Sequence, residues 1–258
     1  MINVLKNLFK KDVVEINEES QKNTLFNEQY ENFKEMSKKD NRFDLKDEDL
    51  FPCLNDNTNV TTFDHHYVYH PAWAARIIAK NNPEFHVDIS STLRFCSILS
   101  AFIPVKFYDY RPAQLNLSNL ECLSADLLKL PFEDNSIKSL SCMHTLEHVG
   151  LGRYGDKLDP NGDLVAIEEL KRVTAEDGAL IIVVPITGSP KIKFNAHRIY
   201  SYKQIMNYFS GFELVQFDLI PDSAQETGMI FNASEADSNK QDYGCGCFYF
   251  KKISDDIA

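Results

Sequence analysis

The chain has 258 residues, of which 43% are hydrophobic and 25% charged, a composition that suits a soluble protein with one sizeable core. Its formal net charge of −11 argues against nucleic acid as the main partner, because such binding draws most of its affinity from Lys and Arg neutralising phosphates. No apolar run reaches the roughly 20 residues that span a bilayer, so we expect no integral membrane segment.

The six cysteines are scattered along the chain, and only Cys245 and Cys247 lie close together. A Cys-x-Cys pair is not the usual spacing of a structural zinc site. We therefore interpret the cysteines as reduced, buried thiols of a cytoplasmic protein. The six are Cys53, Cys96, Cys122, Cys142, Cys245 and Cys247.

Residues 1–58 are polar and rich in charge, and they predict a helical N-terminal extension. Within it, apolar residues recur at three-residue spacing over Asn27–Lys38, which predicts a helix there. Pro52 and the Asn- and Asp-rich residues after it predict an irregular connection. The domain boundaries that we expect are 1–58 for the extension and 59–258 for an α/β domain.

From about residue 70 onward, predicted strands alternate with predicted helices, which indicates a Rossmann-like, doubly wound, mostly parallel sheet. The continuous apolar run Leu180–Val184 predicts a central strand that is covered on both faces. The last strand alternates in character, and we expect it to pair antiparallel at the sheet edge. Predicted helices cover Pro71–Asn81, Phe95–Phe102, Asp163–Val173 and Ser201–Phe209, and predicted strands cover Phe85–Ile89, Val105–Asp109, Leu120–Ser124, Ser136–Met143, Ala179–Pro185, Phe212–Leu219 and Cys245–Lys251.

Acidic residues follow the first three predicted strands, at Asp88, Asp109 and Asp126. The carboxyl ends of parallel strands meet at one edge of a sheet, where ligands bind. Asp109 lies 21 residues after Asp88, and a carboxylate at about this spacing accepts hydrogen bonds from both ribose hydroxyls. Asp126 is placed to accept a bond from an adenine amino group. Each acid taken alone is better explained as a helix cap or part of a solvated turn, whereas the three in register favour a binding site.

Three segments resemble class I S-adenosylmethionine (SAM) methyltransferases. They are Asp126–Ser136 (DLLKLPFEDNS), Ser141–Val149 (SCMHTLEHV) and Glu168–Leu180 (EELKRVTAEDGAL). The resemblance implies the class I methyltransferase fold and SAM as the cofactor. The cofactor-binding residues that we then expect are Asp88 for the methionine amine, Asp109 for the ribose and Asp126 for the adenine, together with Ser90, Leu127 and His144.

Three other segments are similar to a poorly characterised bacterial subfamily that is often found near polysaccharide genes. They are Asp64–Arg76 (DHHYVYHPAWAAR), Gly150–Asp156 (GLGRYGD) and Phe194–Tyr200 (FNAHRIY). This similarity implies a sugar or polysaccharide precursor as the acceptor.

The loop after the first predicted strand departs from the methyltransferase pattern D-x-G-x-G-x-G. Ser90, Thr92 and Arg94 occupy the three glycine positions. Glycine reaches positive φ and lets the backbone approach a ligand, whereas a residue with a Cβ is strained there. The loop therefore either binds SAM by a different path or belongs to a degenerate site.

The end of the fourth predicted strand supplies the candidate catalytic groups. Histidine side chains ordinarily titrate near neutral pH, so His144 and His148 are candidate bases, with His197 as a third. The alternative is that Glu147 and His148 begin a helix and brace the loop. Candidate acceptor-binding residues are Glu147, Arg153, Tyr154, Asn195 and Arg198.

A metal site is the rival interpretation of His65, His66 and His70, because His66 and His70 would meet on a helix at i, i+4. The intervening Tyr67–Tyr69 favours an extended segment instead, and Pro71 disfavours helix at His70. We therefore expect no metal here, and a structural role over the cofactor entrance.

The leading hypothesis is a SAM-dependent methyltransferase for a small-molecule or glycan acceptor with a hydroxyl group. The second is an inert methyltransferase-like module for binding or assembly, which the missing glycines motivate. A nicotinamide-dependent oxidoreductase is weaker, since its loop must approach a pyrophosphate and depends more on glycine. The sequence leaves the oligomeric state open and is compatible with a homodimer.

Overall fold

The computed structural model describes residues 2–39 and 42–254, with side chains from residue 19 onward. The chain divides into two compact units, 1–62 and 63–258. In the first unit, α1 (Ile2–Met36) is far longer than the helix predicted over Asn27–Lys38. Two short 3₁₀ helices follow it, η1 (Ser37–Lys39) and η2 (Asp47–Asp49).

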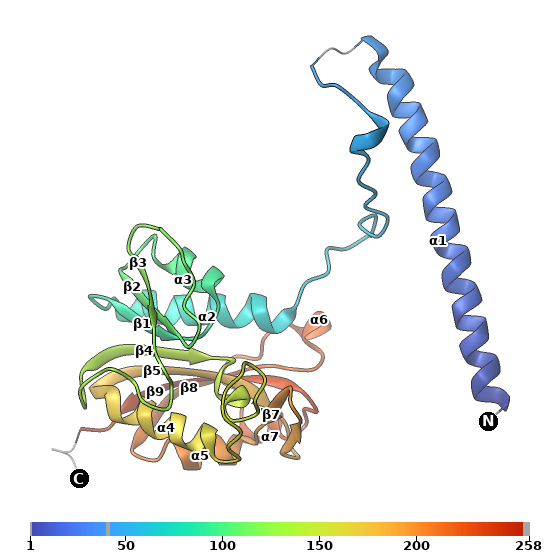
Figure 1. Ribbon diagram of the computed structural model, residues 1–258. Helices are drawn as coiled ribbons and strands as arrows, with labels where there is room; N and C mark the ends of the chain where they lie inside the picture. The colour runs from blue at the N-terminus through green and yellow to red at the C-terminus, as the bar shows by residue number, and fades with distance from the viewer. Residues whose placement is uncertain (1, 40–41, 255–258) are drawn as a thin grey trace. The chain divides into compact units, whose positions relative to one another are not determined.

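The second unit is built on a seven-stranded sheet in the order β3-β2-β1-β4-β5-β9-β8. The five strands from β3 to β5 run parallel, and β9 pairs antiparallel with both β5 and β8 (Figure 1). The Rossmann-like fold class is therefore confirmed. The strands are β1 (His86–Ile89), β2 (Val105–Asp109), β3 (Leu120–Ser124), β4 (Ile137–Met143), β5 (Thr174–Ile186), β8 (Phe212–Ile220) and β9 (Gly244–Lys252).

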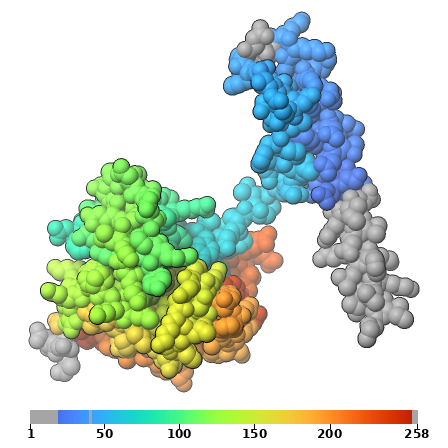
Figure 2. Space-filling view, viewed as in Figure 1, coloured from blue at the N-terminus to red at the C-terminus, as the bar shows by residue number. Residues whose placement is uncertain are grey.

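Helices cover both faces of this sheet. Figure 1 shows α4 and α5 on one side of it and α2 and α3 on the other, and Figure 2 shows α4 in yellow at the surface. Side chains of β5 alternate between the two layers: Leu180 and Ile182 pack into the core under α4 and α5, and Ile181 packs into the core under α2 and α3. The predicted two-sided burial of β5 is confirmed. The helices are α2 (His65–Asn81), α3 (Leu93–Leu99), α4 (Gly162–Val173) and α5 (Tyr202–Tyr208).

Two expectations about these elements are wrong. The last strand, β9, is antiparallel as predicted, but it lies inside the sheet, and β8 forms the edge. The segment predicted as extended, around Tyr67, is the first part of α2. Asp64 caps this helix by accepting a hydrogen bond from the backbone N–H of Tyr67, and Pro71 is accommodated inside it.

Several short elements are absent from the predicted helices and strands, and only the one after β4 was anticipated, by the alternative in which Glu147 and His148 begin a helix. A hairpin of β6 (Lys191–Lys193) and β7 (His197–Ile199) follows β5, and the helices α6 (Ala224–Thr227) and α7 (Glu235–Ser238) follow β8. The 3₁₀ helix η3 (Leu146–His148) follows β4.

All six cysteines are free thiols. Cys53 is exposed and Cys122 is half-buried, so the expectation of buried thiols holds only for the other four. In the part of the chain that the structure describes, the helices are too short or too polar to cross a membrane.

A candidate active site at the ends of β1 and β4

From β1 the chain adds β2 and then β3 on one side, and it then crosses to the other side of β1 to add β4 and β5. The topological switch point of the sheet therefore lies between the neighbouring strands β1 and β4. A crevice forms at such a switch point, at the carboxyl ends of the strands. Ser90 directly follows β1 and His144 directly follows β4. Both have a backbone φ of +54°, in the region that favours glycine. Ser90 thus adopts the left-handed conformation that the first glycine of a methyltransferase loop supplies.

Hydrogen bonds between the two loops hold this conformation in place. The backbone N–H of Met143 donates to the Ser91 hydroxyl at 3.0 Å, and the Thr145 hydroxyl donates to the carbonyl of Ser90 at 2.9 Å. Thr92, at the second glycine position, has an ordinary φ of −106° and caps α3 by accepting from the N–H of Phe95. Of Ser90, Thr92 and Arg94, which stand where the methyltransferase pattern has glycine, only Ser90 carries backbone strain.

Asp88 lies behind this loop rather than in the crevice. Its side chain is completely buried, accepts from the N–H of Ser91 at 3.0 Å and accepts a short hydrogen bond from the hydroxyl of Ser141. Burial raises the pKa of Asp88 to about 6, although these hydrogen bonds lower it. The contacts give Asp88 a role in fixing the loop.

Asp109 and Asp126 meet at a cavity of about 390 Å³, which we call the aspartate cavity. Asp109 accepts from the N–H of Arg111 with Oδ1, and Asp126 accepts from the N–H of Leu128 with Oδ1. Each carboxylate keeps a second oxygen that makes no hydrogen bond among the described residues. The aspartate cavity is lined by Ser90, Ser91, Asp109, Tyr110, Arg111, Ala125, Asp126, Leu127, Leu128, His144, Thr145, His148, Val149, Gly150, Tyr154, Asp156 and Lys157.

A second cavity, of about 940 Å³, adjoins the first, and we call it the histidine cavity. The two cavities share five lining residues, which are Ser90, Ser91, His144, His148 and Tyr154. The histidine cavity is also lined by Asp64, His65, His66, Tyr67, Thr92, Met143, Glu147, Arg153, Asn195, Ala196, His197, Pro221, Asp222, Ala224 and Tyr243.

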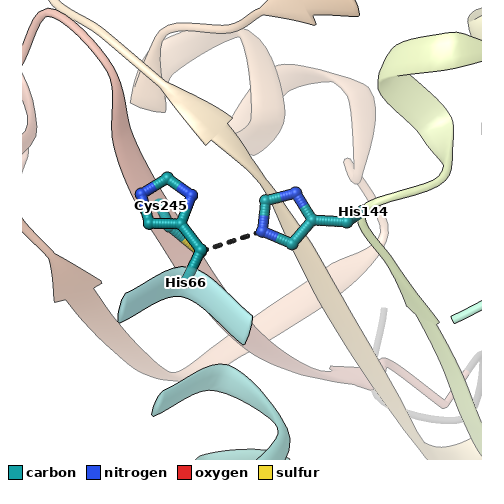
Figure 3. Close-up of side chains that lie close together, drawn as sticks. All are labelled: His66, His144 and Cys245. Carbon is teal, nitrogen blue, oxygen red and sulfur yellow. Dashed lines mark hydrogen bonds between the residues drawn. The ribbon is translucent and has the colours of Figure 1, made fainter. Parts of the chain in front are cut away.

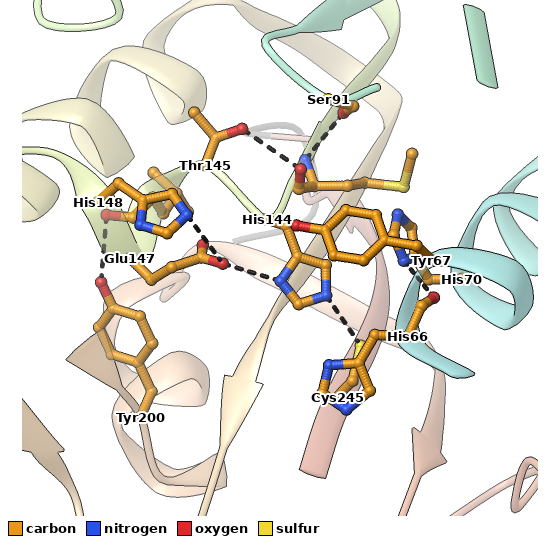
Figure 4. Close-up of polar contacts among 12 residues, drawn as sticks. His66, Tyr67, His70, Ser91, His144, Thr145, Glu147, His148, Tyr200 and Cys245 are labelled. Atoms are coloured by element: carbon orange, nitrogen blue, oxygen red, sulfur yellow. Dashed lines mark hydrogen bonds and ion pairs between the residues drawn. The ribbon is translucent and has the colours of Figure 1, made fainter. Parts of the chain in front are cut away.

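Both ring nitrogens of His144 have partners within the protein (Figure 4). Nδ1 lies 2.8 Å from Oε1 of Glu147, and Nε2 lies 3.4 Å from Sγ of Cys245. Burial disfavours the charged ring, but the Cys245 sulfur and the Glu147 carboxylate outweigh it and raise the pKa of His144 to about 10. With both nitrogens engaged, His144 is poorly placed to take a proton from a substrate.

His148 is better placed to act as a base. Its Nδ1 lies 2.6 Å from the carbonyl of Ala196, which can only accept, so Nδ1 carries the proton and Nε2 holds the free electron pair. Burial lowers the pKa of His148, which keeps the ring neutral at pH 7. The ring borders both cavities.

His197 and Asn195 line the histidine cavity alone. The ring of His197 stacks on Tyr243 at a centroid distance of 5.0 Å, and burial lowers its pKa. Its Nε2 is buried and has no hydrogen-bond partner among the described residues. Because buried polar atoms are normally paired, this nitrogen is a candidate contact for a ligand.

Tyr154 lines both cavities, and two guanidinium groups lie close to its ring. The Arg111 guanidinium carbon lies 4.7 Å from the centre of its ring, and that of Arg153 lies 5.2 Å away. Arg153 also donates to the carbonyl of Ala196 at 3.1 Å. Arg153 and Tyr154 thus lie beside His148 at the cavity wall, in the region expected for acceptor contacts.

Arg198 is separated from this group. It is buried, donates to the carbonyls of Val149 and Pro160 and forms an ion pair with Asp163. Its side chain lines neither cavity. The guanidinium therefore holds the loop before α4 in place.

Sequence reasoning missed several residues that line the cavities or lie next to them. Arg111 directly follows the Asp109–Tyr110 turn, so its position after β2 was a usable signal. Tyr243 and Cys245 come from the far end of the chain, and no local pattern connects them to β4. His66 was considered only together with His65 and His70.

Comparison of the sequence with family models matches residues 133–243 to a family described as "Caenorhabditis protein of unknown function, DUF268". The matched segment contains His144, Glu147, His148, Arg153 and His197, and it leaves out Asp88–Asp126. A search of curated proteins found no match.

Solved structures give a broader likeness. A putative sarcosine dimethylglycine methyltransferase from Galdieria sulphuraria aligns over 71% of this chain and 84% of its own, with a TM-score of 0.50 and 13% identity. The 1,6-didemethyltoxoflavin-N1-methyltransferase of Burkholderia thailandensis, solved with 1,6-didemethyltoxoflavin and S-adenosylhomocysteine, aligns over 72% of this chain and 79% of its own, with a TM-score of 0.51 and 10% identity. At these identities the likeness shows the fold, which is that of class I methyltransferases.

Proposed function

We propose that this protein is a SAM-dependent methyltransferase for a small, hydroxyl-bearing acceptor. The observation that carries the proposal is the meeting of two cavities at the switch point, one with carboxylates and the other with imidazoles. They adjoin at Ser90, His144 and His148. A transfer reaction needs two binding sites in contact, so that the reacting atoms are held close together.

The aspartate cavity suits the adenosyl part of SAM. Asp109 offers a carboxylate oxygen to the ribose hydroxyls, Asp126 offers one to the adenine amino group, and Leu127 supplies apolar wall. Its volume of about 390 Å³ falls within the range of roughly 300–1,000 Å³ that is usual for ligand pockets. Ser90 supports the fit because its backbone already has the conformation that glycine usually provides.

Bound SAM would supply an electrophilic methyl group from its sulfonium centre. The task of the protein is then to hold an acceptor hydroxyl in line and to remove its proton. His148 is the base that we assign, because its ring is neutral, it borders both cavities and its Nε2 makes no hydrogen bond among the described residues, with Oε1 of Glu147 3.9 Å away.

The acceptor would lie in the histidine cavity, against Tyr154, Arg153 and Asn195. The unpartnered Nε2 of His197 would make one of its hydrogen bonds. These polar groups favour a hydroxyl-bearing molecule over an apolar one. The choice of a sugar or polysaccharide precursor rests on the subfamily resemblance alone, and the free thiols favour a cytoplasmic setting.

An inert binding or assembly module is the second candidate. The side chains of Ser90, Thr92 and Arg94 at the glycine positions favour it. Against it, the Ser90 hydroxyl lies 3.3 Å from the carbonyl of Tyr108 and Thr92 caps α3, so both side chains contact the protein itself.

Calorimetric titration with SAM and with S-adenosylhomocysteine tests the proposal. We expect one binding site for each ligand. The Asp109→Asn variant should bind about 10-fold or more weakly, since it loses a charged hydrogen bond worth roughly 1.5–3 kcal/mol. Glu121→Gln on neighbouring β3 is the matched control, because Glu121 lines neither cavity. No heat and no thermal shift with either ligand would instead establish the inert module.

A further inference from the structure

Three side chains of metal-binding type lie close together, and two of them, His66 and His144, line the histidine cavity (Figure 3). They are His66 in the first turn of α2, His144 after β4 and Cys245 in β9, and their donor atoms all lie within 4.8 Å of one another. In a tetrahedral zinc site, bonds of ~2.0–2.1 Å to nitrogen and ~2.3 Å to sulfur put the two donors about 3.5 Å apart. Nε2 of His144 and Sγ of Cys245, at 3.4 Å, already have this spacing.

The surroundings of His144 match those of a metal-binding histidine. Such a ring almost always donates its second N–H to a carboxylate or carbonyl, which fixes the tautomer and orients the ring. Glu147 serves in this way, with Oε1 at 2.8 Å from Nδ1 of His144. Glu147 is itself only 1% exposed, and its Oε2 has no partner among the described residues.

The position of Cys245 does not suit a role as a catalytic nucleophile. Its side chain is completely buried, and it does not line the histidine cavity, whereas His66 and His144 do. A substrate in the cavity would therefore reach an ion held between the three residues more readily than the sulfur behind them.

We propose that His66, His144 and Cys245 bind one divalent cation, with Glu147 as the residue that positions His144. The donor set of two imidazoles and one thiolate suits Zn²⁺. The separation of up to 4.8 Å between donor atoms is larger than in a site with a bound ion. His66 therefore moves inward by about 1 Å on binding. This movement is modest for a half-buried residue in the first turn of α2.

Three protein ligands leave a fourth position, which opens onto the histidine cavity. That is the pattern of a catalytic rather than a structural zinc site. An ion there would hold the acceptor oxygen and lower the pKa of its hydroxyl, a role that rests on the proposed methyltransferase function. The binding of the ion itself does not depend on that function.

Titration of the metal-free, full-length protein with Co²⁺ tests the site, since Co²⁺ replaces Zn²⁺ and absorbs light. We expect one equivalent to bind, with a thiolate-to-cobalt charge-transfer band in the near ultraviolet and the strong visible bands of a tetrahedral ion. Zn²⁺ should then displace the Co²⁺ and abolish both. Protein purified without chelator should contain about one Zn²⁺ per chain by elemental analysis.

Variants separate the ligands from their neighbours. Cys245→Ser should abolish the charge-transfer band, His66→Gln should weaken Co²⁺ binding, and Glu147→Gln should weaken it by about 10–100-fold. Cys96→Ser is the matched control, because Cys96 is equally buried in the same core cluster but is not one of the three converging residues. If Cys245→Ser does not fold, the His66→Gln titration decides, since His66 is only half-buried.

A wild-type protein that shows no thiolate band would overturn the proposal, as would a band that Cys245→Ser retains. So would equal loss of the band in Cys96→Ser. Metal binding without calorimetric SAM binding would leave the site standing while the methyltransferase function failed. Calorimetric SAM binding in a protein that binds no metal would support the methyltransferase function and overturn the metal site.

Discussion

Ser90 shows how a loop can keep a glycine-like conformation without glycine. Its φ of +54° carries strain, and the hydrogen bonds from Met143 to Ser91 and from Thr145 to Ser90 hold the loop against it. The sequence predicted that a residue with a Cβ would be strained here. It could not predict the bracing, because the bonds join residues more than 50 positions apart.

Substitution of Ser90 tests this strain. Ser90→Gly should raise the free energy of unfolding by up to about 1 kcal/mol, because glycine removes the clash of the Cβ. Ser90→Val should lower it by about 1–3 kcal/mol. Thr92→Gly is the control and should lower it, since Thr92 has no strain to relieve and loses its cap. Urea unfolding measures all three, and a loss of stability in Ser90→Gly would contradict the account.

Asp88 should make stability depend on pH. Its pKa of about 6 in the folded chain lies above the ordinary value of 3.8, so the folded state keeps a proton that the unfolded state has released between about pH 4 and 6. The stabilisation from this proton is complete below about pH 4 and is lost as the pH rises through 6.

The Asp88→Asn variant removes this dependence. Relative to the wild type, its free energy of unfolding should rise by up to about 3 kcal/mol from pH 4 to pH 6, at about 1.4 kcal/mol per pH unit, and then stay level. Urea unfolding at each pH from 4 to 8 measures the difference. A difference that stays constant over this range would show that Asp88 ionises normally.

At the scale of elements, the strands were predictable and their lateral order was only partly so. Continuous apolar runs such as Leu180–Val184 mark a buried strand directly. The inner position of β9 depends on its pairing with β5 and β8. The residue pattern within Gly244–Lys252 does not indicate these partners. The helix around Tyr67 was missed because β-favouring residues outweighed the cap at Asp64.

Arg198 in β7 links this strand to the loop before α4 by hydrogen bonds and an ion pair. Removal of its charge leaves the buried Asp163 without its cation and with only the hydrogen bond from the Tyr200 hydroxyl, so Arg198→Met should lower the free energy of unfolding by about 3–5 kcal/mol. Arg153→Met is the matched control, with a change within about 0.5 kcal/mol, because Arg153 is exposed. If urea unfolding gave the two variants similar free energies of unfolding, the structural role of Arg198 would be contradicted. The acceptor contact predicted from the sequence would then be favoured.

At the scale of the whole molecule, both core clusters consist of residues from the unit 63–258. This unit contains both cavities as well. Assignment of residues 1–58 as a separate extension remains a prediction. Candidate site residues on β1 to β4 were predictable because strand ends share one edge, whereas Cys245 was not, since it lies 101 positions from His144 in the sequence.

The central claim is that the two cavities form one transfer site, with the cofactor on the aspartate side. A crystal structure of the full chain soaked with S-adenosylhomocysteine tests this most directly. The account predicts electron density for the adenosyl group between Asp109, Asp126 and Leu127, with the sulfur toward His148. An aspartate cavity without ligand at saturating concentration, or the ligand bound elsewhere, would contradict it.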